Sequence, residues 1–204
     1  YTTTQVKVDA IRALGAEIVQ CETPVRFQVA EELSRKLGAT MIQSFNDEDI
    51  MAGQGTAGLE IVEQCPEVDK VIVPVSGGGL IGGVSTAIKG MAPRVKVYGA
   101  EPAALPRYSE SLKVGKPVKV EQKRSLADAL VAQIPGDICF PYVQANLDGI
   151  VTISDDELVE TFLDMMEKHK MVVENSGLLT VAALQHIDCK GKFVVPILSG
   201  GNMD

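Results

Sequence analysis

Apolar positions along the chain alternate between two periods. Stretches with apolar residues three and four apart predict helices over residues 6–14, 26–37, 56–64, 80–89, 155–170 and 176–186. Short β-branched runs predict strands over residues 17–21, 40–43, 70–75, 95–100, 150–153 and 193–198. Residues 101–135 lack such periodicity and predict loops with a short helix at 109–113. The alternation is typical of βαβ units, so we expect an α/β protein with a twisted, mainly parallel sheet and helices on both faces.

Local signals place several helix ends and one division of the chain. Gly15 and Gly38 follow helical stretches and are expected to end them. Ser154 and Glu157 have capping-box spacing, which predicts a helix start. The polar stretch 44–49 predicts a connection between two lobes. We therefore expect one domain over residues 1–47 and a larger one over residues 48–204.

The amino-acid composition limits the kinds of partner that the protein is expected to bind. Hydrophobic residues make up 46% of the 204 residues, whereas aromatic residues make up 4%, which predicts an aliphatic core. A net charge of −8 argues against binding to nucleic acid or an anionic membrane surface, since no basic field attracts either. No apolar run approaches the roughly 20 residues of a membrane span.

Cysteine usage indicates a reducing compartment. The four cysteines are scattered, no two have C-x-x-C spacing, and only two histidines accompany them, so a zinc site is not expected. Reduced thiols are consistent with a cytoplasmic protein. The chain starts without a methionine, so the natural N-terminus is expected to lie outside it, and organellar targeting stays open.

A glycine-rich loop carries the main chemical signal. Ser76, Gly77, Gly78, Gly79 and Leu80 directly follow a predicted buried strand and precede a predicted helix. Three glycines without Cβ atoms allow an oxyanion to approach successive amides, and the helix dipole adds positive potential. No G-K-[ST] follows, which excludes a Walker A loop. We predict a phosphate site, with a tight packing turn as the alternative.

The same loop also fits a dinucleotide-binding pattern. Gly77, Gly79 and Gly82 satisfy G-x-G-x-x-G, and Glu101 follows 19 residues after Gly82, where an acid that binds ribose is expected. A nicotinamide-dependent oxidoreductase is therefore an alternative. Against it, the loop opens with a serine, and a second glycine turn ends the last predicted strand.

The second glycine turn decides between these interpretations. The sequence PILSGGN places Ser199 at the carboxyl end of a strand, where open α/β sheets bind ligands. With AGQGT, VPVSGGGLIGG and VVENSG, which precede it along the chain in this order, the chain resembles the serine/threonine dehydratase and serine racemase branch of the fold-type II pyridoxal-phosphate enzymes, which have a tryptophan-synthase-β-like fold. QVKVDAIRALGAEIV and SFNDEDIMAGQGT are most similar to threonine dehydratase.

The resemblance implies a cofactor and residue roles. Pyridoxal 5'-phosphate would be bound through its phosphate by Ser76, Gly77, Gly78, Gly79 and Leu80, and Ser199 would hydrogen-bond the pyridine nitrogen. A hydroxyl cannot form an ion pair with pyridinium, so the ring nitrogen should stay largely neutral, which favours loss of a β-hydroxyl. Glu174 matches a glutamate near the ring, although an acid favoured by a following helix dipole explains it equally.

The resemblance also implies a mono- or divalent cation beside the active site. Glu101 matches a ligand of such a cation, and the carbonyl of Leu105 could be a second ligand. Arg107, however, stands where one relative has an aspartate. A positive charge at this position disfavours a divalent ion.

Two family motifs are absent from the sequence. Neither the S-x-K-x-R-G-A motif with the Schiff-base lysine nor the Ser-Gly-Asn-His loop for the substrate carboxylate occurs, and both are expected before Tyr1. Residues 1–47 would then be the remnant of a small α/β domain, and residues 48–204 the large cofactor domain. His169, His186, Gln54 and Thr56 are expected to be structural.

The activity that follows is α,β-elimination of water from L-threonine or L-serine, giving a 2-oxo acid and ammonia, in a homo-oligomer. Serine racemisation is the close alternative, because the groups that face the substrate are expected outside this chain. A nicotinamide-dependent oxidoreductase and a truncated, non-catalytic cofactor-binding protein stay open as other classes.

Overall fold

The computed structural model describes residues 3–22 and 25–202. The chain divides into two compact units, one ending at Gln43 and one spanning Ser44–Asn202. The first unit contains α1 (Gln5–Ala13) and α2 (Arg26–Leu37), and Gly38 ends α2 in the left-handed conformation as expected. Among its described residues, Val8 is the sole buried hydrophobic side chain. This unit therefore has little core of its own.

Two predicted strands are not present in the first unit. Residues 17–21 and 40–43 adopt no regular structure. A strand is held by hydrogen bonds to a neighbouring strand, and within the described part of the chain these segments find none. The β-branched pattern was therefore insufficient to predict strands here.

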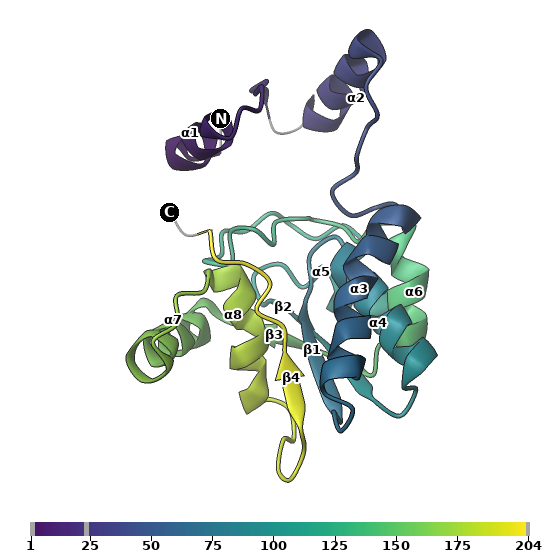
Figure 1. The fold of residues 1–204 in the computed structure, drawn as a ribbon, viewed down its shortest axis with the longest axis vertical. Helices are drawn as coiled ribbons and strands as arrows, with labels where there is room; N and C mark the ends of the chain where they lie inside the picture. Colours follow the sequence, from purple (N-terminus) through teal and green to yellow (C-terminus); the bar gives the residue numbers. More distant parts are fainter. Residues whose placement is uncertain (1–2, 23–24, 203–204) are drawn as a thin grey trace. The chain divides into compact units, whose positions relative to one another are not determined.

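The second unit is built on a parallel sheet in the order β3-β2-β1-β4 (Figure 1). The strands are β1 (Lys70–Pro74), β2 (Lys96–Pro102), β3 (Gly149–Ile153) and β4 (Val194–Pro196). Every described pairing is parallel, which confirms the predicted α/β class.

Helices cover both faces of this sheet (Figure 1). Val71, Val73 and Val75 point into a core with α3 (Glu48–Gln64), α4 (Gly79–Met91), α5 (Arg107–Val114) and α6 (Cys139–Asn146). Ile72 points to the other face, against α7 (Asp155–Asp164) and α8 (Asn175–Ala182). Alternate residues of one strand thus bury their side chains in two layers.

Helix α3 begins eight residues before its predicted start. Asp47 is its N-cap and accepts hydrogen bonds from the amides of Asp49 (2.8 Å) and Ile50 (3.1 Å). The glycines of α3 allow it to lie against α4, since a Cβ on Gly58 would be 2.8 Å from the Val84 carbonyl oxygen. Close packing thus outweighs low helix propensity.

Other helix boundaries differ more modestly. Helix α6 was not predicted; it contains Pro141, which is tolerated because it lies in the first helical turn. Ser154 and Glu157 form the expected capping box of α7. The predicted helix 155–170 changes to a π-helical turn at Met165–His169, and α8 ends in a 3₁₀ turn at Ala183–Gln185.

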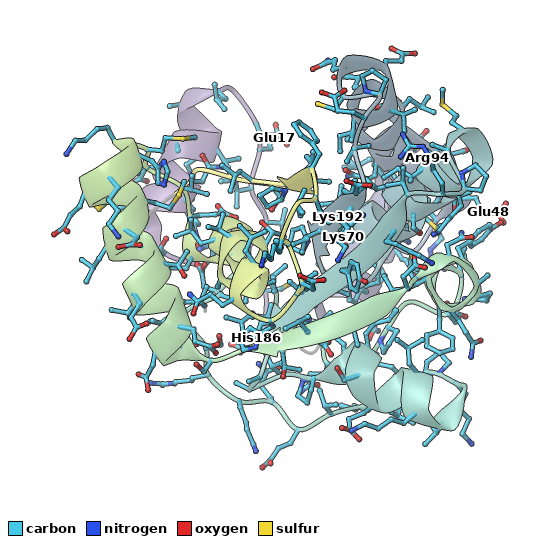
Figure 2. All side chains as sticks on the ribbon, turned by 90° about the horizontal axis from the view of Figure 1, so that it is seen from below. Glu17, Glu48, Lys70, Arg94, His186 and Lys192 are labelled. Carbon is cyan, nitrogen blue, oxygen red and sulfur yellow. The ribbon has the colours of Figure 1, made fainter. Side chains whose placement is uncertain are left out.

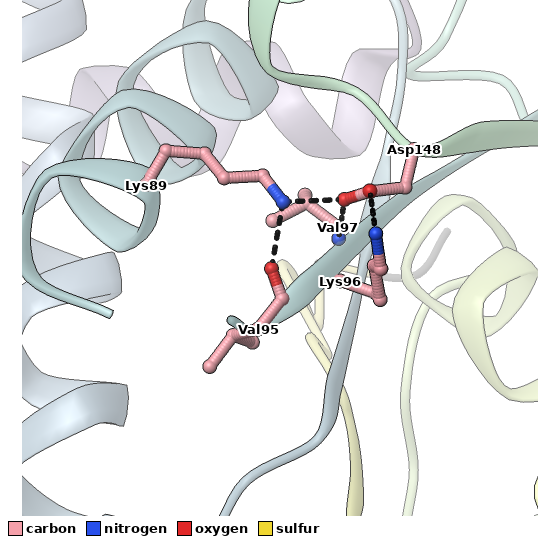
Figure 3. Close-up of polar contacts among 5 residues, drawn as sticks. All are labelled: Lys89, Val95, Lys96, Val97 and Asp148. Atoms are coloured by element: carbon pink, nitrogen blue, oxygen red, sulfur yellow. Dashed lines mark hydrogen bonds and ion pairs between the residues drawn. The ribbon is translucent and has the colours of Figure 1, made fainter. Parts of the chain in front are cut away.

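A charged cluster joins three elements at the amino-terminal edge of the sheet (Figure 3). Asp148 accepts hydrogen bonds from Lys89 Nζ (2.6 Å), Lys96 Nζ (2.8 Å) and the Val97 amide (2.8 Å). Burial raises the pKa of Asp148, but these hydrogen bonds outweigh it, so its pKa lies below the ordinary value.

Replacing Asp148 by Asn should lower the free energy of unfolding at pH 7 by about 1–3 kcal/mol, since three donors lose a charged acceptor. Because the folded-state pKa is lowered, the contribution is present at neutral pH and is lost as pH falls through that pKa. Urea unfolding at pH 7 and pH 3 measures both effects. Glu110→Gln, which removes an exposed ion pair with Lys113, is the control and should change little. An equal loss for D148N at both pH values would contradict the electrostatic explanation.

Candidate functional site

The candidate site lies at the carboxyl edge of the sheet, between β1 and β4. These strands are direct neighbours, with Ile72 opposite Pro196, whereas β2 and β3 lie on the other side of β1. The strand order therefore reverses between them, and segments 76–79 and 197–201 leave the same edge. Such switch points are where open α/β sheets bind ligands.

The glycines of the first segment are required by close packing. Gly78 has φ +111°, and a Cβ there would lie 1.9 Å from Tyr108 Oη. A Cβ on Gly77 would lie 2.4 Å from the ring of Phe45, and one on Gly79 would lie 3.0 Å from the Phe45 backbone. Packing therefore accounts for the missing side chains whether or not the loop binds a ligand.

The hydrogen-bond acceptors of the glycine-rich loop are bonded to other parts of the protein. The Gly77 carbonyl accepts from the Gly136 amide (2.8 Å) and from Tyr108 Oη (3.1 Å), and Ser76 Oγ accepts from the Ala132 amide (3.3 Å). Burial raises the pKa of Tyr108, so its hydroxyl stays protonated and donates. The loop is thus held through its acceptors.

The backbone N–H donors of the glycine-rich loop have no hydrogen-bond partner among the described residues. Gly77, Gly78 and Gly79 are buried, and their amides donate to no described group outside α4. Buried amides are nearly always paired in folded proteins. Helix α4 begins at Gly79 and has no acidic residue in its first turn, so its dipole adds to an anion-binding end. These groups fit a phosphate.

The second segment brings Glu174 beside the turn that contains Ser199. The Glu174 carboxylate accepts from the Asn202 amide (3.2 Å), and a Cβ on Gly200 would lie 2.6 Å from its carboxyl oxygen Oε1. Glu174 is the N-cap residue of α8, but its side chain does not cap the helix. Ser199 is exposed, and its hydroxyl has no hydrogen bond to the described residues. It is therefore available to a ligand.

Glu101 lies in a different environment from the one a ribose ligand needs. It is fully buried at the end of β2, and its carboxylate accepts from the amides of Tyr108 (2.9 Å) and Ser109 (2.7 Å). Burial raises its pKa despite these hydrogen bonds. Since both oxygens serve α5, this geometry argues against the dinucleotide interpretation. The Leu105 carbonyl accepts from the Arg107 amide (2.9 Å).

Two lysines lie at the opposite end of the sheet. Lys70 and Lys192 are at the amino-terminal ends of β1 and β4, as Figure 2 shows from below. Lys70 donates to the Asp188 carbonyl, and Lys192 is 3.9 Å from Asp69. His186 is hydrogen-bonded to Glu157. Each of these side chains thus has a partner within the protein.

Sequence reasoning missed Phe45 and Tyr108, which pack on the glycine loop. Phe45 lies in the stretch SFNDEDIMAGQGT, but neither residue was assigned a role, and each reaches the loop from a distant part of the chain. The available signal was indirect: three consecutive glycines imply that something bulky lies against the backbone.

These features define an α/β protein with a candidate anion site and a serine-containing turn at one switch point. The family model described as "Pyridoxal-phosphate dependent enzyme" matches residues 1–200. The chain therefore belongs to this family of fold-type II pyridoxal-phosphate enzymes, as the sequence motifs predicted.

Relatives include threonine and serine enzymes. The chain is 42% identical over 202 residues to an L-threonine ammonia-lyase of Thermotoga maritima, covering 97% of this chain and 50% of that protein. It is 33% identical over 207 residues to a serine racemase of Oryza sativa, covering 97% and 61%. The chain thus spans about half the length of the threonine ammonia-lyases it matches.

Solved structures share the fold. The crystal structure of a threonine deaminase from T.th. matches with a TM-score of 0.92 at 35% identity, covering 97% of this chain and 67% of that one. Maize serine racemase matches with a TM-score of 0.92 at 31% identity, covering 100% of this chain and 64% of that one.

No described helix is long and apolar enough to cross a membrane.

Proposed function

We propose that the protein containing this chain is a pyridoxal-phosphate-dependent ammonia-lyase that removes water from L-threonine or L-serine, giving a 2-oxo acid and ammonia. The observation that carries the proposal is the pairing of a glycine-rich loop after β1, whose amides are unpaired among the described residues, with an exposed serine hydroxyl after the neighbouring strand β4. Pyridoxal phosphate has a phosphate at one end and a pyridine ring at the other. Its binding site therefore needs one group for the phosphate and another for the ring.

Each segment has a distinct task. The amides of residues 77–80 hold the phosphate, and the Ser199 hydroxyl hydrogen-bonds the pyridine nitrogen. When bound, the cofactor supplies an electron sink for the bonds at Cα of the amino acid. Because Ser199 carries no charge, it does not stabilise a protonated ring, which tempers that sink. Glu174 lies beside Ser199 and fixes the turn through the Asn202 amide.

The catalytic lysine is not assigned to this chain. Several described lysines have acidic partners: Lys89 and Lys96 bond to Asp148, Lys113 to Glu110 and Lys168 to Asp164. We propose that the lysine and the substrate-carboxylate loop lie in a part of the protein outside these 204 residues, and that the active protein is a cytoplasmic homo-oligomer. Serine racemase relatives make racemisation a second candidate.

The test compares the full-length protein with the 204-residue chain. The full-length protein should convert L-threonine to 2-oxobutyrate or L-serine to pyruvate, measured by a coupled dehydrogenase assay, while chiral chromatography detects D-serine. The short chain should show no turnover and no stoichiometric pyridoxyl-lysine after borohydride reduction and mass mapping. D-serine without oxo acid would favour the racemase. Turnover by the short chain, with a labelled lysine in it, would contradict the assignment.

A further inference from the structure

A buried arginine lies directly behind the candidate phosphate loop. Arg107, the first residue of α5, is 0% exposed. Its Nη1 donates to the Val75 carbonyl and its Nη2 to the Leu130 carbonyl, each at 2.8 Å. Its Nε has no hydrogen-bond partner among the described residues. Burying an arginine in this way is costly, so its position calls for an explanation.

Both carbonyls belong to segments that shape the loop. Val75 is the last residue before Ser76, at the point where β1 turns into the loop. Leu130 lies two residues before Ala132, whose amide donates to Ser76 Oγ. The buried guanidinium therefore links the end of β1 at Val75, where the loop begins, to the segment at Leu130, which bonds to the loop through Ala132.

The oxygen atoms around the guanidinium are of the kinds that bind hard cations. Two backbone carbonyls and a nearby carboxylate are oxygen ligands typical of K⁺, Mg²⁺ or Ca²⁺ sites. Here the carboxylate is Glu101. Burial raises the pKa of Glu101 and lowers that of Arg107, and the attraction between the two charges opposes both shifts. Both Glu101 oxygens already accept from α5 amides. A metal ion added here would face a buried positive charge and an occupied carboxylate.

The residues therefore do not fit the cation that the family resemblance implies. We propose that Arg107 is a built-in cation of this site: its guanidinium takes the place of a bound metal ion and positions the phosphate loop. Arg107 is a positioning residue, because its side chain contacts the Val75 and Leu130 carbonyls that support the loop. The proposal rests on the proposed function only in that pyridoxal phosphate is the ligand of the loop.

The first experiment uses the wild-type full-length protein. Its dissociation constant for pyridoxal phosphate and its melting temperature should be unchanged, within twofold and 1–2 °C respectively (about the precision of such assays), by EDTA or by K⁺, Mg²⁺ or Ca²⁺ at constant ionic strength. A larger response to any of them would show that a metal ion contributes and would overturn the proposal. Absence of cofactor binding altogether would instead count against the proposed function.

The second experiment uses variants. Arg107→Met keeps most of the volume without the donors and should weaken cofactor binding at least tenfold. Arg107→Ala should respond similarly, and guanidinium ion in the millimolar range should restore part of its affinity. Arg94 offers a matched control, since it also bridges two carbonyls, those of Val68 and Pro66, but at the amino-terminal edge of the sheet.

Arg94→Met should lower stability without changing cofactor affinity. If R107M bound the cofactor as tightly as the wild type, Arg107 would only fill space and the proposal would fail. If R107M did not fold, Arg107→Lys decides. One ammonium cannot reach both carbonyls in the geometry of the guanidinium fork, so R107K should bind the cofactor more weakly while still folding. Wild-type affinity in R107K would equally overturn the proposal.

Discussion

Gly78→Asp should remove the preference of the full-length protein for pyridoxal phosphate over pyridoxal. Gly78 has φ +111°, and a side chain there would meet Tyr108 Oη, so the loop must shift. The added carboxylate would also repel the phosphate. Two charge-assisted hydrogen bonds contribute about 3–4 kcal/mol, which corresponds to a factor of about 10²–10³ in affinity. Fluorescence titration with both ligands measures this factor directly.

The comparison of two ligands separates a phosphate site from a packing turn. If the loop binds phosphate, G78D should bind pyridoxal phosphate about as weakly as pyridoxal, while its affinity for pyridoxal changes little. If the loop only packs, both ligands should lose affinity together as the fold weakens. Gly90→Ala is a suitable control on the same helix, because a Cβ there meets no atom within 4 Å. It should leave both affinities unchanged.

The sequence pattern was sufficient to locate the four strands of the sheet, although not their order. The strand containing Val71 and Val73 is buried on both faces, and such strands read clearly as β-branched runs between turn residues. The two glycine turns could be placed at strand ends for the same reason. Their adjacency, however, depends on β4 pairing with β1 rather than with β3, which no local pattern specifies.

Other features depended on contacts between distant residues. The early start of α3 follows from its close approach to α4, and the segments 17–21 and 40–43 lack the partner strands that their composition implied. Spacing predicted a ribose ligand for the carboxylate of Glu101, and the family resemblance implied a cation. Its actual partners are amides of the following helix, because burial leaves it no solvent and requires donors nearby.

Ser199 is the position at which one substitution should redirect the chemistry without disturbing the fold. Its side chain is exposed and bonds to no described residue, so an aspartate can be accommodated there. Its carboxylate would stabilise a protonated pyridine ring through an ion pair. The neighbouring Glu174 is held by the Asn202 amide, and its like charge would be the main obstacle. S199D should therefore still bind the cofactor, but with the pyridine ring protonated.

The expected result for Ser199→Asp is a changed absorption spectrum of the bound cofactor and at least a tenfold fall in the ratio of 2-oxo acid to pyridoxamine phosphate formed from L-threonine. A more strongly withdrawing ring stabilises charge at Cα for longer, which favours side reactions over prompt loss of the hydroxyl. Ser199→Ala is the matched control. It removes one hydrogen bond, worth about 0.5–1.5 kcal/mol, and should reduce affinity by roughly tenfold or less without changing the products. Should S199D keep both the spectrum and the product ratio of the wild type, the hydroxyl of Ser199 does not contact the ring, and the orientation of the cofactor between β1 and β4 must be reassigned.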